Sequence, residues 1–203
     1  GAGSALFGGD TSNDKIEIAH DSTLNITNAI SICTWVKPTV PSTYKGIIDK
    51  GALGSANGVY TVWLDNSASP KIKFGLNVAD VTLVTDDTIS INEWTHIACT
   101  YDEDAGGSTE MKIYINGVLS KEGAYSTVIA TNSTVLNIGQ YQNDNAYEFA
   151  GNISQLGLWD EALSQAQIQS IMEKTYDELT TSERADLVSY WPLDVDATDS
   201  HGD

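Results

Sequence analysis

The sequence is short of basic residues and of long apolar runs, and each shortage argues against a class of protein. Ten Lys and Arg stand against 28 Asp and Glu in 203 residues, which gives a net charge of −18. Binding to nucleic acid or to an anionic membrane requires basic patches, so neither partner is expected. No apolar run approaches the roughly 18 residues that cross a bilayer, so no membrane insertion is expected either.

The excess of acid has two explanations that composition leaves open. Asp-rich loops are compatible with Ca²⁺, which takes hard oxygen ligands. A surface adapted to salty surroundings would also be rich in Asp, because charge keeps a protein soluble. We expect no secretory leader in the opening residues, GAGSAL, which we interpret as the edge of a piece of a longer protein.

Motifs of catalytic machinery are missing as well. The chain has no Gly-x-Ser-x-Gly elbow, no His-Glu-x-x-His pair and no phosphate-binding loop. The acid-rich stretch YDEDAGGSTE (101–110) contains glycines, which indicate a loop tip rather than a catalytic strand. His96 lies in a strand-like run, where we expect it to be packed or hydrogen-bonded. We therefore expect no enzyme activity.

The sequence is rich in alternation of apolar and polar residues with a period of two. In KIKFGLNV, for example, Ile72, Phe74 and Leu76 fall on one face. Asn116-Gly117 suits the type I′ turn of a hairpin. About ten or more such short strands, separated by turn signals, predict an all-β antiparallel sandwich of jelly-roll type.

Helix signals occur only late in the chain. Ser164 and Gln167 form a capping box before the apolar residues of QAQIQSIM, and Thr180 and Glu183 form another before ADL. One or two short C-terminal helices are expected, within a single domain that spans residues 1–203.

Five stretches in order resemble a laminin-G-like (LamGL, pentraxin-like) domain of the concanavalin A-like lectin/glucanase superfamily. They are ALFGGDTSNDKIEIAHDSTLNITNAISICTWVKP (5–38), EWTHIACTYD (93–102), KIYINGVL (112–119), LNIGQ (136–140) and FAGNISQLGLWDEALSQAQI (149–168). The resemblance implies a concanavalin A-like jelly roll. This chain lacks the Glu-x-Asp-x-x-Glu strand with which glucanases of this superfamily cleave glycosides.

Residues 187–203, LVSYWPLDVDATDSHGD, resemble the first strand of the same family, although they lie at the end of this chain. They either complete the sandwich or begin the next repeat of a tandem array. The first alternative is favoured here, because an uncovered sheet edge would be prone to pair with other chains.

The two cysteines, Cys33 and Cys99, lie in apolar strand-like runs. They are either two buried thiols or one disulfide, which would indicate an oxidising compartment. The pentraxin resemblance implies the disulfide, with Cys33 at the matching place. Cys99 is displaced by one residue, and such a shift changes the face on which a side chain lies.

Two calcium sites are expected. In the turn GGDTSND, residues Asp10, Asn13 and Asp14 could converge on a cation, although an Asx-rich turn explains them equally well. The second site is implied by the pentraxin resemblance, which differs here in having Tyr141 where the family has an acid. Its expected ligands are Asn57, Gln142, Asn143, Asp144 and Glu148.

Glycan recognition needs exposed aromatic rings that stack on sugars, together with amides and acids that bind hydroxyl groups. The loop that contains Tyr141 and Tyr147 supplies both kinds of group. Trp63 is a weaker candidate for stacking on a sugar, because we expect it in the core. The alternative is a set of rim residues that cover the edge of the sandwich. The expected ligand-binding residues are Tyr141, Asn143, Asn145, Tyr147 and Tyr44.

Together these observations predict a non-catalytic, Ca²⁺-supported lectin-like module that binds a glycan or a glycosylated surface. It would belong to a larger protein that is extracellular, secreted or displayed on a cell or virion. One alternative is a structural or adhesive module of a tandem adhesin or viral surface protein, with neighbouring domains as partners and calcium only stabilising. A third is an accessory domain of a glycoside hydrolase.

Overall fold

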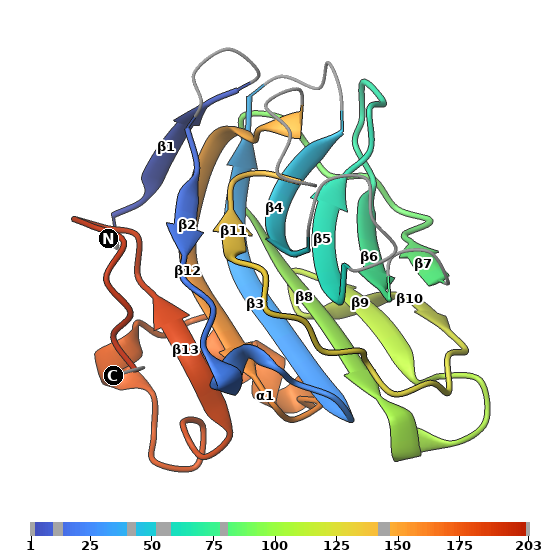
Figure 1. Ribbon diagram of the computed structural model, residues 1–203. Helices are drawn as coiled ribbons and strands as arrows, with labels where there is room; N and C mark the ends of the chain where they lie inside the picture. The colour runs from blue at the N-terminus through green and yellow to red at the C-terminus, as the bar shows by residue number, and fades with distance from the viewer. Residues whose placement is uncertain are drawn as a thin grey trace.

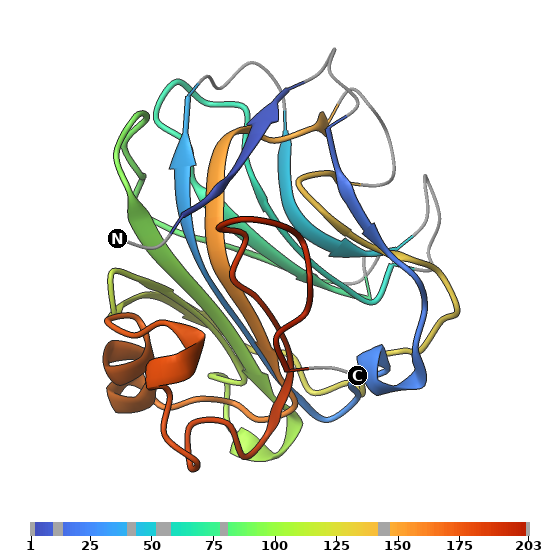
Figure 2. The ribbon, with the colours of Figure 1, turned by 90° about the vertical axis from the view of Figure 1, so that its left-hand side faces the viewer.

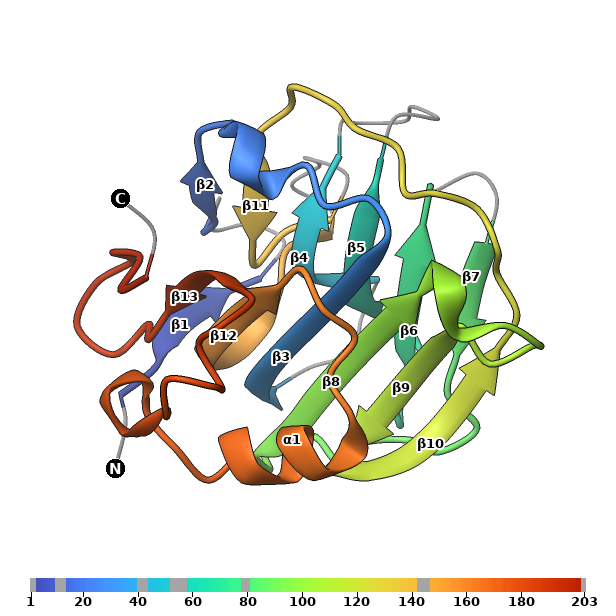
Figure 3. The same ribbon diagram turned by 90° about the horizontal axis from the view of Figure 1, so that it is seen from below.

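The computed structural model describes residues 3–9, 14–39, 44–51, 58–77, 81–141 and 147–201. In these residues the chain forms two antiparallel sheets that pack face to face, with a short helix outside one of them (Figures 1 and 3). The predicted antiparallel β-sandwich is confirmed.

Each sheet is built from strands that are distant in sequence. The seven-stranded sheet runs β1 (Ala5–Gly8), β12 (Ala150–Trp159), β3 (Ala29–Pro38), β8 (Thr95–Asp102), β9 (Met111–Ile115) and β10 (Val118–Gly123), with β13 (Leu187–Trp191) also paired to β12. The six-stranded sheet runs β2 (Ile16–Ile18), β11 (Leu136–Ile138), β4 (Lys45–Lys50), β5 (Tyr60–Leu64), β6 (Ile72–Leu76) and β7 (Val81–Val84).

The core lies between the sheets and follows the alternation seen in the sequence. Ile72, Phe74 and Leu76 of β6 are fully buried in it, because alternate residues of a strand point to the same face. The predicted hairpin is confirmed: Asn116 and Gly117 have φ of 49° and 73° and join β9 to β10, and φ is positive at both central residues of a type I′ turn.

Strand β12 carries two strands on one edge. Its residues 150–153 pair with β1, and residues 156–159 pair with β13, while its other edge pairs with β3. Residues 187–191 therefore complete the sandwich within this chain. Segments from near the two chain ends come together here, since Ser154 Oγ donates hydrogen bonds to the carbonyl oxygens of Gly3 at 2.6 Å and Pro192 at 3.5 Å. Strands β1 and β13 lie on the same side of β12 in Figure 1.

Helix α1 (Gln165–Ile171) lies on the outer face of the seven-stranded sheet (Figures 2 and 3). Its predicted capping box is confirmed, because Ser164 and Gln167 exchange backbone and side-chain hydrogen bonds. Ile168 and Ile171 pack in a second apolar cluster outside the sandwich, together with Tyr114 of β9.

The prediction of a helix from Thr180 is wrong, although its capping box forms. Thr180 N donates to Glu183 Oε2 at 2.8 Å, and Glu183 N donates to Thr180 Oγ1 at 3.3 Å. Residues 181–186 are nevertheless only hydrogen-bonded turns, since Leu187 already pairs with Trp159 in the sheet. The other short helical segments among the described residues are the 3₁₀ turns η1 (Ser22–Leu24), η2 (Glu103–Ala105) and η4 (Tyr176–Glu178).

The expected disulfide is not formed, and both cysteines are buried thiols. The register of β3 and β8 places Cys33 opposite Ala98 and Cys99 opposite Ile32. Cys33 therefore faces the cluster under α1, whereas Cys99 faces the core between the sheets. The displacement of one residue in the sequence sends the two side chains to opposite faces.

We expect both thiols to be unreactive in the folded protein, because burial raises the pKa of each and only the thiolate is nucleophilic. Alkylation followed by mass spectrometry should modify neither cysteine in buffer and both in denaturant without reductant. A melting temperature that falls on addition of dithiothreitol would contradict this assignment.

Candidate functional site

Four aromatic side chains gather on the outer face of the six-stranded sheet, and we call Tyr44, Trp63, Tyr141 and Tyr147 the aromatic cluster. The rings of Trp63 and Tyr141 are stacked, with centroids 4.9 Å apart and planes inclined by 8°. Tyr147 lies 5.9 Å from Tyr141 and 6.2 Å from Tyr44. The cluster is thus a continuous aromatic surface that joins three separate segments of the chain.

Trp63 is the base of the aromatic cluster, and its position corrects the expectation that it lies in the core. Its neighbours Val62 and Leu64 point into the core, so Trp63 points to the opposite face. There it is 6% exposed. Its ring lies over Gly75, where a Cβ would come within 2.9 Å of the indole.

A glycine also explains how Tyr141 reaches Trp63. Gly46 pairs with Trp63 across β4 and β5, and a Cβ on Gly46 would lie 2.1–2.2 Å from the backbone of Gln140 and Tyr141. No side chain fits at that distance, so glycine permits the close approach of the two backbones. The segment after β11 can therefore lie flat on the sheet, with Tyr141 above Trp63.

The outermost members of the cluster are Tyr44 and Tyr147. Tyr44 is 37% exposed and Tyr147 is half-buried, whereas Tyr141 is 9% exposed. Lys73 places its Nζ 5.2 Å from the Tyr44 ring centre and 6.0 Å from that of Trp63. Two tyrosine rings and one ammonium group thus face the solvent above a buried aromatic base.

Tyr141 and Tyr147 flank the base of one loop. Tyr141 N donates to Tyr147 O at 3.2 Å, and Gln140 and Glu148 form an antiparallel bridge just below them. The side chains of Gln140 and Glu148 are both fully buried. The expected ligands Gln142, Asn143, Asp144 and Asn145 fall in the residues between, which lie outside the described part of the chain.

The other expected metal ligands are only partly placed. Asp10, Asn13 and Asn57 lie outside the described residues. Asp14 Oδ2 accepts a hydrogen bond from Gly8 N at 2.9 Å. Among the described residues, no three His, Cys, Asp or Glu side chains are grouped to hold a metal ion.

Asn137 and Asp49 are two polar residues of the outer face that were not expected from the sequence. They are register neighbours in β11 and β4, and they are 0% and 2% exposed. Leu136 and Ile138 face the core, so Asn137 faces outward. In the described structure neither its amide oxygen nor its amide nitrogen makes a hydrogen bond, and such burial is costly.

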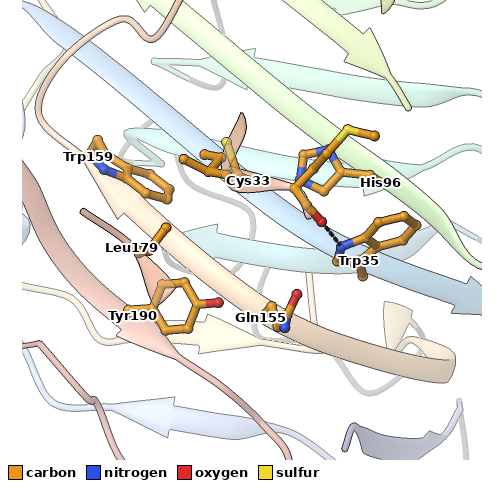
Figure 4. Close-up of a pocket in the computed structure, with 9 residues that line it drawn as sticks. Cys33, Trp35, His96, Gln155, Trp159, Leu179 and Tyr190 are labelled. Carbon is orange, nitrogen blue, oxygen red and sulfur yellow. Dashed lines mark hydrogen bonds between the residues drawn. The ribbon is translucent and has the colours of Figure 1, made fainter. Parts of the chain in front are cut away.

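A small cavity lies between the seven-stranded sheet and the segments that cover it, lined by Cys33, Trp35, His96 and Trp159 among others (Figure 4). Its volume of about 10 Å³ is at the lower limit for a single water molecule. It is therefore a packing gap and not a ligand site. His96 packs edge-on against Trp35, with ring centroids 5.3 Å apart, as expected for a packed strand residue.

The family model of the Concanavalin A-like lectin/glucanases superfamily matches residues 10–169. The chain belongs to this superfamily.

A curated relative and two solved structures are similar to the chain. Human pentraxin-related protein PTX3 is 25% identical over 154 residues, which are 70% of this chain and 38% of the relative. The chain thus spans well under half the length of the curated relatives that it matches first.

No helix in the described residues is long and apolar enough to cross a membrane.

The structures share the fold at low sequence identity. A candidate carbohydrate binding protein from Bacteroides ovatus has a TM-score of 0.76 at 17% identity, covering 99% of this chain and 56% of that one. The CBM40 of Ruminococcus gnavus IT-sialidase, bound to α2,3-sialyllactose, has a TM-score of 0.60 at 15% identity, covering 81% of this chain and 99% of that one.

We expect His96 to make stability depend on pH between about 6.5 and 4. Burial lowers the pKa of His96 from 6.5 to about 4, so in this range the unfolded chain binds the proton and the folded chain does not. The free energy of unfolding should therefore fall as pH falls, by about 3 kcal/mol from this residue.

Urea titrations at several pH values would test this with His96→Phe, which keeps a ring against Trp35. The difference between wild type and variant isolates His96 from the carboxylates. An equal slope in both proteins between pH 6.5 and 4 would contradict the assignment.

Proposed function

We propose that this chain is a non-catalytic module that recognises glycans through the aromatic cluster on the six-stranded sheet. The observation that carries the proposal is the surface formed by Tyr44 and Tyr147 over the stacked pair of Trp63 and Tyr141. An aromatic ring offers an apolar face for a pyranose, and a tyrosine hydroxyl adds a polar group. Fold neighbours with carbohydrate-binding names or ligands support the ligand class.

The buried base of the cluster suits this role. Trp63 and Tyr141 hold the ring positions by stacking, while the two outer tyrosines remain accessible. A rigid aromatic surface loses little conformational entropy on binding, which favours affinity. Lys73, beside Tyr44, adds a cation and hydrogen-bond donors for sugar hydroxyls or carboxylates.

Calcium is proposed as a supporting ion on this same outer face. Asp49 and Asn137 are register neighbours, so their carboxylate and amide side chains leave the sheet on the same face, and both residues are buried. Calcium prefers ligands of these two types, and an amide without a hydrogen bond gains a partner when it ligates an ion. Glu148, which is also buried, lies at the base of the loop in which the sequence predicts further ligands.

A binding role is also consistent with where titrating carboxyl groups lie. Catalytic acids are found in clefts, with a pKa moved toward neutrality. Burial, followed by a hydrogen bond with Asp186, raises the pKa of Glu161, but Glu161 is exposed on the turn after β12. It lies neither in the aromatic cluster nor in the small cavity beneath α1.

We propose an extracellular or surface-displayed setting, where glycans are available to such a module.

Replacing the outer tyrosines should weaken glycan binding without unfolding the protein. On a glycan array, Tyr147→Ala and Tyr44→Ala should each lower the affinity for the best ligand by about tenfold, the effect of losing one stacked ring. The phenylalanine variants of both residues keep the ring and are the matched controls.

Melting temperatures should be the same for all four variants within a few degrees, because surface substitutions cost little stability. Trp63→Ala is unsuitable, since it would remove the buried base. Wild-type protein that binds no glycan on the array would refute the proposal and favour a spacer module.

The calcium proposal predicts that wild type and Asn137→Leu differ in stability in one direction in EDTA and in the opposite direction in Ca²⁺. Asn137→Leu removes the buried amide, so in EDTA the variant should be more stable than wild type by about 1–3 kcal/mol. In Ca²⁺ the wild type should gain stability through binding, and the variant should gain much less.

Thermal melts with Ca²⁺ and with EDTA would measure both effects. Asn137→Asp is the control, because it retains an oxygen ligand and should keep the response to calcium. A wild-type melting temperature that is the same in calcium and EDTA would exclude a stabilising site.

A further inference from the structure

The outer face of the seven-stranded sheet is covered over only part of its area. Under α1 and η4 the face is sealed by the cluster that contains Cys33, Tyr114 and Tyr190. Trp35 lies two residues after Cys33 on β3 and therefore on the same face, but it is only half-buried. It marks the boundary at which the cover ends.

A hollow of about 360 Å³ opens at this boundary, lined by Trp35, Trp94, Ser154 and Gln155. A second hollow of about 140 Å³ is lined by Gln155, Tyr176, Asp177 and other residues, and both include Gln155. Figure 4 shows Gln155 between Trp35 and Tyr190 on this face. Because Gln155 lines both hollows, they adjoin at this residue, and we call the two together the groove. The larger hollow alone lies in the range of ligand sites, roughly 300–1,000 Å³.

Two tryptophans define one end of the groove. Trp94 is 42% exposed and lines the same hollow as the half-buried Trp35. Trp35 is held in place, because its Nε1 donates to Met172 O at 3.2 Å and its ring contacts His96. One exposed indole and one that is held by a hydrogen bond thus line the same opening.

Gln155 stands at the centre of the groove in a costly backbone conformation. Its φ is +52°, a region that side chains other than Gly, Asn and Asp rarely adopt. It lies in a bulge between Ser154 and Gly157 of β12. Its side-chain amide makes no hydrogen bond to a described residue, although its backbone N donates to Pro192 O at 3.0 Å. Strain of this kind is concentrated at functional sites.

The other end of the groove supplies acceptors. Asp177 and Asp194 line it and are exposed, and Tyr176 lies beside them, with the Arg184 guanidinium 4.4 Å from its ring centre. Carboxylates accept hydrogen bonds from sugar hydroxyls. They repel anionic ligands, as does the net charge of −18.

We propose that this groove is a second binding site, for a neutral oligosaccharide whose sugar rings stack on Trp94 and Trp35 while Gln155 binds their hydroxyl groups. It lies on the opposite sheet from the aromatic cluster and uses none of its residues. The inference shares the ligand class of the proposed function, but it can hold or fail independently.

An array that carries lactose, α2,3-sialyllactose and other neutral and sialylated oligosaccharides tests the groove. Wild type should bind at least one neutral oligosaccharide. Trp94→Ala should weaken that binding by about tenfold or more, while Tyr147→Ala should leave it unchanged. Each variant is thus the control for the other site.

Gln155→Gly separates a ligand-binding role from a structural one. Glycine adopts φ of +52° without strain, so the melting temperature should be unchanged or higher while neutral-glycan binding is lost. A lower melting temperature would indicate a structural role for Gln155 and count against the proposal.

Three other results would refute the proposal that the groove binds a neutral oligosaccharide. They are no binding of any neutral oligosaccharide, undiminished binding by Trp94→Ala, and a loss of neutral-glycan binding in Tyr147→Ala alone. The last would leave the aromatic cluster as the binding site and so uphold the proposed function without the groove.

Discussion

The rest of the structure depends on how β12 holds two strands along one edge. β1 and β13 come from the two ends of the chain, and both must hydrogen-bond to the same side of β12. The strand divides between them at a bulge, where pairing with β3 shifts between Ser154 and Gly157. A bulge re-aims the side chains next to it, and here that side chain is Gln155. The bulge in β12 thus lies both where the edge passes from β1 to β13 and where Gln155 is placed on the outer face.

The two sheets build their outer faces by different means. On the six-stranded sheet, glycines at positions 46 and 75 leave room for Trp63 to lie flat and for Tyr141 to lie above it. On the seven-stranded sheet, α1 and η4 bring their own apolar side chains and cover part of the face. Aromatic residues are left at the surface in both cases, on the first sheet above a buried ring and on the second beside the edge of the cover.

The fold could be predicted from the sequence, because its information is local. Period-two alternation places Ile72, Phe74 and Leu76 in the core, and Asn116-Gly117 encodes its own turn. The Ser164 capping box produces a helix. The same signal at Thr180 produces only turns, because β13 begins too soon. A local signal thus succeeds where the following segment leaves it room.

The candidate site was only partly predictable. Tyr141 and Tyr147 were expected because they lie in one loop with amides and acids, and Tyr44 because it lies in a Pro-Ser-Thr loop. Alternation in TVWLD already separates Trp63 from Val62 and Leu64. Gln155 left no such signal, because a bulge breaks the alternation by which a strand is recognised. The predicted disulfide is wrong for a different reason, although the displacement of Cys99 by one residue was visible in the sequence. Whether two cysteines on neighbouring strands face each other depends on register, which pairing across the sheet decides.

The placement of two sites on opposite sheets limits what they could do together. Avidity arises when two sites engage one target at once, and it is lost when geometry forbids this. The aromatic cluster and the groove face away from each other across the sandwich, so one flat glycan surface could meet only one of them. Two separate glycan chains could be bound, one on each face. A module of this shape is therefore suited to bridging glycans rather than to gripping one surface twice, and the acidic groove would restrict the second chain to neutral sugars.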